Sequence, residues 1–292
     1  MPLPVDLLLS LIIVTGSGFV VYWFCALRNT LGSLRPTPYQ WFVGAVTDFF
    51  DTLGIGSFAT TTTMWRARKT VKDEHIPGTL NVGHTLPTIL QAYFYIDSVQ
   101  VETLTLFTMI GAAIAGSLLG APIVARLPRQ QIQRGLGLAL LVLCAVLVYR
   151  QFGDPTGGEA EGLSGYMLAI GILGNFVLGA LMTIGVGLYA PCLLMVSLLG
   201  LNQKVAFPIM MGSCAFLMPL ASVPFIRLRS YDARAALGLT LAGVPAVYIA
   251  AKLVKEMDLK MVKWLVAAVI IYTSISLLRA ASKCSSKPVT RP

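Results

Sequence analysis

The sequence predicts an all-α polytopic membrane protein made of two inverted repeats, each with a re-entrant helical hairpin broken by glycines, plus an extra N-terminal helix. Its 292 residues are 56% hydrophobic and only 12% charged, whereas a soluble domain usually carries about 25% charged residues. Apolar stretches near the ~20 residues that span a bilayer recur along the whole length. The clearest stretches are 6–27, 101–125, 135–149, 205–226, 235–251 and 261–278.

No long polar region separates these stretches, so residues 1–292 are expected to form a single membrane domain. The stretch 6–27 lacks the basic start of a signal peptide and is expected to remain as the extra N-terminal helix. Repeat one is predicted at 38–150 and repeat two at 163–280, with a cytoplasmic tail at 281–292. The lipid bilayer is therefore the expected surroundings of the chain.

Two glycine-containing segments carry the evidence for a repeat, TDFFDTLGIGSFATTTT at 47–63 and LMTIGVGLYAPCLLMVS at 181–197. When the second is slid back by 131 positions, its Thr-Ile-Gly-Val-Gly lies on Thr-Leu-Gly-Ile-Gly, and Pro208 lies on Pro77. Further along, Gly243 lies on Gly111 at a shift of 132. Self-similarity over so long a period is typical of the two halves of a transporter.

Loop charges indicate that the repeats are inverted. The loops 66–75 and 126–134 are rich in Lys and Arg, which is typical of cytoplasmic loops. The 97–102 turn between them carries two carboxylates and is expected outside, whereas its second-half counterpart, 227–234, holds three arginines and is expected inside. The same turn then faces opposite sides in the two halves, with the N-terminus outside.

Inversion has a consequence for the glycine segments. Residues 38–65 must begin and end on the cytoplasmic side, and residues 163–199 must begin and end outside, so each is predicted to turn back within the membrane at its glycines, 54–56 and 185–187. Non-helical backbone at membrane depth occurs only where it is buried in protein or lines a cavity. Two broken elements at matching positions therefore indicate a binding site near the midplane.

The residues around these turns favour a small oxyanion as ligand. Half-helices that start at such turns direct backbone N–H groups and positive dipole ends at the centre. Hydroxyls, an amide and an imidazole add further donors, while no Lys or Arg lies in the middle of a spanning segment. The alternative is that Ser and Thr merely pack helices. The candidate substrate-binding residues are Gly54, Gly56, Ser57, Thr60, Asn81, His84, Thr85, Gly185, Gly187, Cys192 and Ser213.

Asp48 and Asp51 are candidates for proton coupling. They lie three residues apart and so share one helix face. Ionisable residues within spanning segments are rare and usually functional. The alternative places the pair near the membrane interface or makes it a cap for the hairpin turn. His84 is either a packing residue or the next candidate for a proton carrier.

Other classes of function find little support in the residues. The five cysteines show no CxxC spacing, and no His, Cys or Asp spacing fits a metal site, so no cofactor or metal is expected. The basic residues cluster in short connecting loops and form no basic face with aromatics, so no nucleic-acid partner is expected. An enzyme needs a nucleophile and a base; Cys192 and Cys214 with His84 are the only candidates, and their spacing does not support catalysis.

The two glycine turns, each followed by an apolar helix and then a proline-containing polar helix, resemble the TauE/SafE family, the sulfite exporter or 4-toluene sulfonate uptake permeases. The resemblance covers residues 40–280. The second half keeps Gly185, Gly187 and Pro191, whereas the first half has Ser57 and a threonine run where the family often shows a further glycine and a proline.

This resemblance implies a secondary transporter, and most simply an exporter, of small sulfur-containing anions such as sulfite or organosulfonates. It also implies a multi-pass protein of the bacterial inner (plasma) membrane, with a small anion as its partner. Proton coupling is compatible with the residues. A passive anion channel and a membrane assembly subunit without transport activity remain open alternatives.

Overall fold

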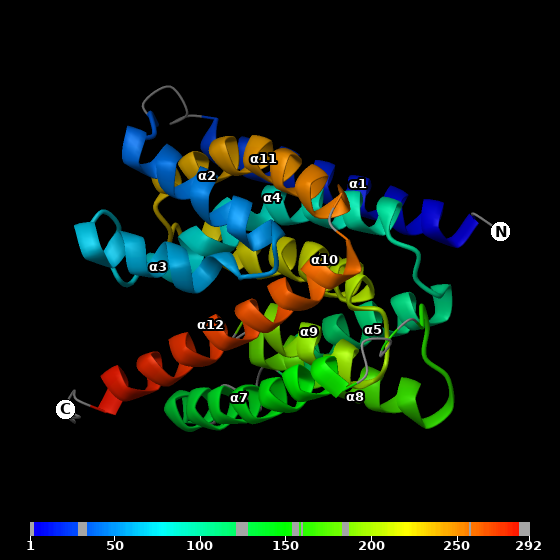
Figure 1. The fold of residues 1–292 in the computed structure, drawn as a ribbon. Helices are drawn as coiled ribbons and strands as arrows, with labels where there is room; N and C mark the ends of the chain where they lie inside the picture. The colour runs from blue at the N-terminus through cyan, green and yellow to red at the C-terminus, as the bar shows by residue number, and fades with distance from the viewer. Residues whose placement is uncertain are drawn as a thin grey trace.

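The computed structural model describes residues 3–28, 34–120, 128–153, 158, 160–182, 187–256 and 258–285. In this part of the chain the secondary structure is helical apart from one isolated bridge, which confirms the predicted all-α class (Figure 1). The elements are α1 (Leu3–Leu27), α2 (Pro38–Thr52), α3 (Ser57–Arg68), α4 (Ile76–Ser98), α5 (Thr103–Ala115), the π-helical η2 (Gly116–Gly120), α7 (Arg129–Gly153), α8 (Gly165–Met182), α9 (Tyr189–Leu198), the 3₁₀ turn η3 (Gln203–Val205), α10 (Ala206–Arg227), α11 (Ala233–Glu256) and α12 (Leu259–Ser285).

Six helices in the described residues are long and apolar enough to cross a membrane, so the chain is a multi-pass membrane protein. They are Pro4–Leu27, Thr103–Gly120, Gly165–Met182, Gln203–Arg227, Ala233–Leu253 and Trp264–Ser282. Five of them coincide with predicted spanning stretches, and α1 is the predicted N-terminal helix. The sixth, α8, was expected as one arm of a hairpin. The predicted stretch 135–149 lies within α7.

The first glycine break separates two short helices. Pro38 and a capping box between Thr37 and Gln40 start α2, because these groups satisfy the free N–H groups of its first turn. Gly54 and Gly56 between α2 and α3 have φ values of 92° and 84°. This left-handed region is readily available only to glycine, so the chain turns where the sequence predicts.

The second break lies between Met182, the last residue of α8, and Tyr189, the first of α9. Gly185 lies outside the described residues. Gly187 is described, and its φ is not positive. The two breaks therefore differ at one of the aligned glycines.

The two glycine-broken pairs of helices, α2–α3 and α8–α9, each return to the end of the bundle where they begin. In the first pair, the Tyr39 hydroxyl donates to the Met64 carbonyl at 2.8 Å, and the Arg68 guanidinium lies 4.3 Å from the centre of the Tyr39 ring. In the second, Ala160 ahead of α8 forms a bridge with Leu201, just beyond α9. A re-entrant hairpin requires this arrangement.

The loops gather at two ends of the bundle. The Glu102 N–H donates to the Glu161 carbonyl at 2.8 Å, which joins two loops expected outside. The Asp232 N–H donates to Thr79 Oγ1 at 2.9 Å, which joins the loop before α11 to the start of α4. The start of α1 and the end of α12 lie at opposite ends (Figure 1). Inverted repeats require this grouping, and the two-fold relation between the halves stays a prediction.

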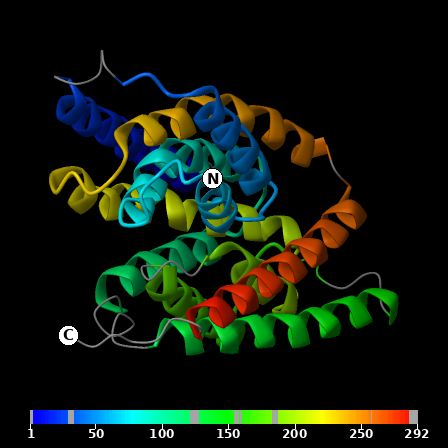
Figure 2. The same ribbon diagram turned by 90° about the vertical axis from the view of Figure 1, so that its left-hand side faces the viewer.

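Helices of the two predicted repeats pack mainly across the boundary between them. The most extensive contacts include α2 with α11, α4 with α10, α5 with α8 and α7 with α12. Figure 2 shows the α2–α11 pair on one side of the bundle and the α7–α12 pair on the other. Glycines permit the close approaches: a Cβ on Gly44 would lie 2.7 Å from Leu239 Cα, and a Cβ on Gly179 would overlap the Ala113 carbonyl. Small residues at such contacts are typical of membrane helices.

Candidate functional site

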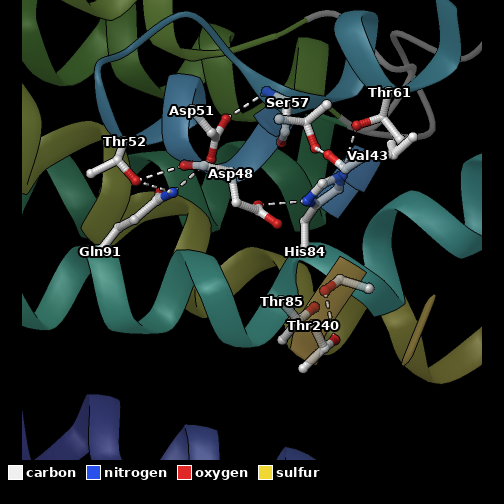
Figure 3. A network of polar contacts seen from close by, with 12 residues as sticks. Val43, Asp48, Asp51, Thr52, Ser57, Thr61, His84, Thr85, Gln91 and Thr240 are labelled. Atoms are coloured by element: carbon white, nitrogen blue, oxygen red, sulfur yellow. Dashed lines mark hydrogen bonds and ion pairs between the residues drawn. The ribbon is translucent and has the colours of Figure 1, made fainter. Parts of the chain in front are cut away.

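A buried polar network lies where α2, α3, α4 and α9 meet (Figure 3). Asp48, His84 and Gln91 are each 0% exposed, and Asp51 is 2% exposed. Ionisable side chains at such depth in a membrane protein are costly and usually face a functional interior. The network therefore marks the candidate site.

Asp48 and His84 form an ion-pair contact within this network. His84 Nδ1 lies 2.7 Å from Asp48 Oδ1, and His84 Nε2 lies 3.1 Å from Thr61 Oγ1. The imidazole of α4 thus connects the carboxylate of α2 to a hydroxyl of α3. Asp48 Oδ2 has no hydrogen-bond partner. This oxygen lies against α11, because a Cβ on Gly243 would overlap it.

Asp51 has a different role in the same helix. Its Oδ1 accepts a hydrogen bond from the Ser57 backbone N–H at 2.5 Å, and its Oδ2 accepts one from Gln91 Nε2 at 3.0 Å. The carboxylate thereby caps the N-terminus of α3, where its charge also complements the helix dipole. The structure thus supplies the geometry of the capping alternative for Asp51.

The helices that follow the two glycine breaks, α3 and α9, meet at the Asp51 carboxylate. Tyr189, the first residue of α9, places its hydroxyl 3.2 Å from Gln91 Oε1 and 3.5 Å from Asp51 Oδ2. The shorter contact, to Gln91, is the better formed. Asp51 and Gln91 together therefore hold the first turn of α3 and the first turn of α9 side by side.

One face of α4 supplies most of the partners. His84, Thr88, Gln91 and Tyr95 follow one another at spacings of three or four residues, and the Tyr95 hydroxyl donates to the Thr52 carbonyl at 2.8 Å. Sequence reasoning named His84 but missed Gln91, Tyr95 and Tyr189. Helical periodicity from His84 is a signal that points to Gln91 and Tyr95, whereas no local pattern points to Tyr189.

The hydroxyls of the threonine run mostly bond within α3. Thr60 donates to the Ser57 carbonyl at 2.7 Å, and Thr62 and Thr63 donate to the carbonyls four residues before them. Thr61 differs, because its hydroxyl contacts His84 on another helix. This pattern matches the packing alternative for most of the run, and a substrate contact of Thr60 stays a prediction.

Two further candidates on α4 also bond locally. Asn81 Nδ2 donates to the Pro77 carbonyl at 2.9 Å. Thr85 Oγ1 donates to the Asn81 carbonyl and lies 3.3 Å from Ser222 Oγ on α10. Neither side chain is brought to the Asp48–His84 pair by a hydrogen bond.

The second-half candidates lie in a less polar region. Cys192 on α9 is fully buried in the hydrophobic core. Ser213 Oγ on α10 donates to the Ile209 carbonyl and accepts from Asn175 Nδ2 at 3.2 Å. Asn175 Oδ1 is buried without a partner. Among the described residues, Tyr189 alone joins this half to the Asp48–Asp51 network through a side-chain hydrogen bond.

The network is closed off in this structure. Two surface hollows, one between α7 and α12 and one along α8 and α9, are lined mainly by apolar side chains. Neither includes a residue of the polar network. No group of three or more His, Cys, Asp or Glu side chains that could hold a metal occurs in the described part of the chain. The arrangement can hold protons and dipolar contacts rather than a metal.

The comparison with known families decides the identity. The model of the family Sulfite exporter TauE/SafE matches residues 41–277, which leaves out only α1, the start of α2 and the C-terminal end. The chain belongs to the TauE/SafE family. No curated protein and no solved structure shows a match to it. TauE/SafE proteins form a transporter family rather than an enzyme family, so the chain is at family level a membrane transporter for sulfite or related sulfur-containing anions.

Proposed function

We propose that this TauE/SafE protein is a secondary transporter that exports small sulfur-containing anions across the bacterial inner membrane, with coupling to protons. The observation that carries the proposal is the convergence of α3 and α9 on one buried carboxylate, through the Ser57 N–H and the Tyr189 hydroxyl. Broken helices that meet in the interior are the usual setting of a transport site. Dipole ends and hydroxyls there favour an oxyanion.

The donors available favour an anion of low charge. The buried polar and charged side chains of the described residues include Asp, His, Asn, Gln, Ser and Thr but no Lys or Arg. A dianion without a buried cation would face two carboxylates unaided, which is costly in a medium of low polarity. Singly charged sulfonates and hydrogen sulfite are therefore the preferred substrates in this proposal.

Substrate binding at the start of α3 requires Asp51 to move. In the closed arrangement its carboxylate already accepts from the N–H of Ser57, which is the donor that the sequence assigns to substrate. Separation of α3 from α9 would free this N–H together with Gly56, whose Cβ position has no atom within 4 Å. We assign the first substrate contacts to this turn and the matching ones to Gly187 and Cys192.

Flux into proteoliposomes tests the function. The purified protein is reconstituted and offered sulfite, sulfate, thiosulfate, sulfoacetate and taurine, each with and without a pH gradient. We expect the protein to move sulfite or a sulfonate. We also expect a pH gradient to drive accumulation of the anion above its equilibrium concentration. Equilibration without accumulation would identify a passive channel instead, and no flux of any member of the panel would overturn the transport assignment.

A further inference from the structure

Asp48 is buried between three helices in an unusual way. Its Oδ1 lies 2.7 Å from His84 Nδ1, while its Oδ2 has no donor and is pressed against Gly243 of α11. Pro87 packs at the same place, with Cγ 2.8 Å from the position of a Cβ on Gly243. One carboxylate oxygen is thus satisfied and the other is enclosed by groups that donate nothing.

The charge of the pair follows from this enclosure. With one proton shared between them, Asp48 and His84 are either carboxylate and imidazolium or carboxylic acid and imidazole, and both forms have no net charge. Without that proton the pair carries a negative charge in a closed apolar site, where an unpaired charge is expensive. The charge of Asp51, one turn away on the same helix face, adds to this cost. The closed arrangement therefore favours one bound proton.

Asp51 lacks this reason to hold a proton. Its two oxygens accept from the Ser57 N–H and from Gln91 Nε2, and the Tyr189 hydroxyl lies within 3.5 Å. Hydrogen bonds of this kind stabilise a carboxylate. The same carboxylate ties three helices together, so its geometry is that of a positioning residue.

We propose that Asp48 and His84 together bind the single proton that is exchanged during transport, while Asp51 stays ionised and positions α3 and α9; this inference rests on the proposed function. When α11 separates from α2, Asp48 Oδ2 meets water, and the proton passes between the pair and that water. When the helices close, the proton is enclosed. Thr61 connects the bound proton to α3, because Thr61 Oγ1 lies 3.1 Å from His84 Nε2.

The surroundings contain few competing groups. The titratable side chains that face the pair are Asp51 on α2 and Tyr189 on α9. Tyr95 on α4 and Cys214 on α10 interact with Asp51 instead. Among the described residues, α3 presents the Thr61 hydroxyl and α11 presents the backbone at Gly243. An anion near the start of α3 attracts a proton on the pair, so proton and anion are expected to bind together and move in the same direction. Export in this form is driven by the outward concentration gradient of the anion, and an imposed pH gradient can drive the reverse movement.

A spectroscopic experiment tests the proton site without any need for transport. Infrared difference spectra of the purified protein between acid and alkaline buffer report a carboxyl group that changes protonation. In Asp51→Asn this signal should persist, and in Asp48→Asn it should disappear. His84→Gln, which removes the partner, should shift the signal on the pH axis. A signal that persists in Asp48→Asn and is lost in Asp51→Asn overturns the inference.

A transport experiment then separates this inference from the proposed function. Methanesulfonate is singly charged and takes up no proton near neutral pH, unlike sulfite, so any proton that moves with it belongs to the protein. The quantity measured is the ratio of pH-driven uptake to counterflow. In Asp48→Asn and His84→Gln this ratio should fall about tenfold, within the range typical of coupling between two ligands. In Asp51→Asn both rates should fall together and the ratio should hold.

The outcomes are distinct. A wild-type protein that moves anions without any pH stimulation overturns the coupling in the proposed function, and with it a transport role for the pair. A wild-type protein that is stimulated, together with an Asp48→Asn variant that is stimulated equally, overturns this inference alone. Anion movement opposite to the proton would contradict their binding together. Melting temperatures of all variants, measured in detergent, identify any that fail to fold.

Discussion

The two glycine-broken pairs of helices, α2–α3 and α8–α9, have a similar arrangement but differ in the chemistry of their side chains. Under the repeat alignment, Asp48 corresponds to Gly179, Asp51 to Met182 and Thr61 to Cys192. The first pair is held by carboxylates, an imidazole and an amide, whereas Gly179 approaches a backbone carbonyl and Cys192 lies among apolar side chains. Under the predicted duplication, the break and the close helix packing are kept, while the Asp side chains at these positions occur in the first pair alone.

This difference separates the residues that permit close helix packing from the residues that supply ionisable groups. The α2–α11 and α5–α8 contacts both rely on glycines that let two backbones approach. At the first contact the gap opposite Gly243 is filled by the Asp48 carboxylate, and at the second Gly179 meets the carbonyl of Ala113. Of the two positions that the repeat alignment matches, one therefore carries the carboxylate that we propose to bind the proton, and the other carries none.

The largest effect is expected from filling these glycine contacts. In Gly44→Val and Gly179→Val the new side chain would meet backbone atoms that cannot move aside, and overpacking typically costs about 1–3 kcal/mol or more. Both variants should lose most of their folded, monodisperse protein in fluorescence-detected size-exclusion chromatography. Gly18→Val on α1, with nothing within 4 Å of its Cβ, is the matched control. A normal yield of folded, monodisperse protein for Gly179→Val, but not for Gly44→Val, would show that the two contacts are not equivalent.

The next effect concerns the amide that holds both hairpins. Gln91→Leu removes the donor to Asp51 Oδ2 and the acceptor for Tyr189, and leaving such groups unpaired costs about 1–3 kcal/mol. The melting temperature should fall clearly. Ser222 is also buried, on α10 of the second half, but it donates to the Met218 carbonyl of its own helix, so Ser222→Ala should shift the melting temperature much less. Equal shifts would show that the halves do not differ as described.

A smaller effect isolates backbone strain at the two turns. Gly56 and Gly187 both have open space at the Cβ position, but only Gly56 has a positive φ, of 84°. Gly56→Ala should therefore cost about 1–2 kcal/mol from the left-handed conformation. Gly187→Ala should leave stability within about 0.5 kcal/mol of wild type. Thermal unfolding in detergent measures both, and a larger loss for Gly187→Ala would contradict the geometry.

The smallest effects separate the threonines of α3. Thr61→Val removes the hydroxyl that meets His84 Nε2 and should cost about 1 kcal/mol. Thr63→Val removes only an exposed bond to the Ala59 carbonyl and should change stability by less than about 0.5 kcal/mol. Comparison of their melting temperatures decides the point. Indistinguishable values would mean that Thr61 is an ordinary packing residue.

Local patterns in the sequence were sufficient for the helical class and the first glycine break, and they singled out Asp48, Asp51 and His84, which the structure places in one buried network. Glycine pairs, loop charges and rare buried charges each leave a signal that needs no tertiary contact. The site itself needed the structure. The Asp48–His84 pair joins residues of two helices, and Tyr189 reaches Gln91 from the other half of the chain.

The threonine run shows why composition alone misleads. As a string of hydroxyls beside a helix start, it suggests a ligand-binding row. In the folded helix most of these hydroxyls find the carbonyl three or four residues before them, and Thr61 points to His84 instead. Which hydroxyl leaves its own helix depends on the partner that tertiary packing brings opposite it.

The most direct test of this account counts the protons that accompany each methanesulfonate in proteoliposomes, in the wild type, in Asp48→Asn and in Ser213→Ala of the second half. The account predicts that protons move with the anion in the wild type and in Ser213→Ala, and that none accompany it in Asp48→Asn. A wild-type ratio in Asp48→Asn, or loss of proton movement in Ser213→Ala, would contradict the assignment of proton binding to the first hairpin.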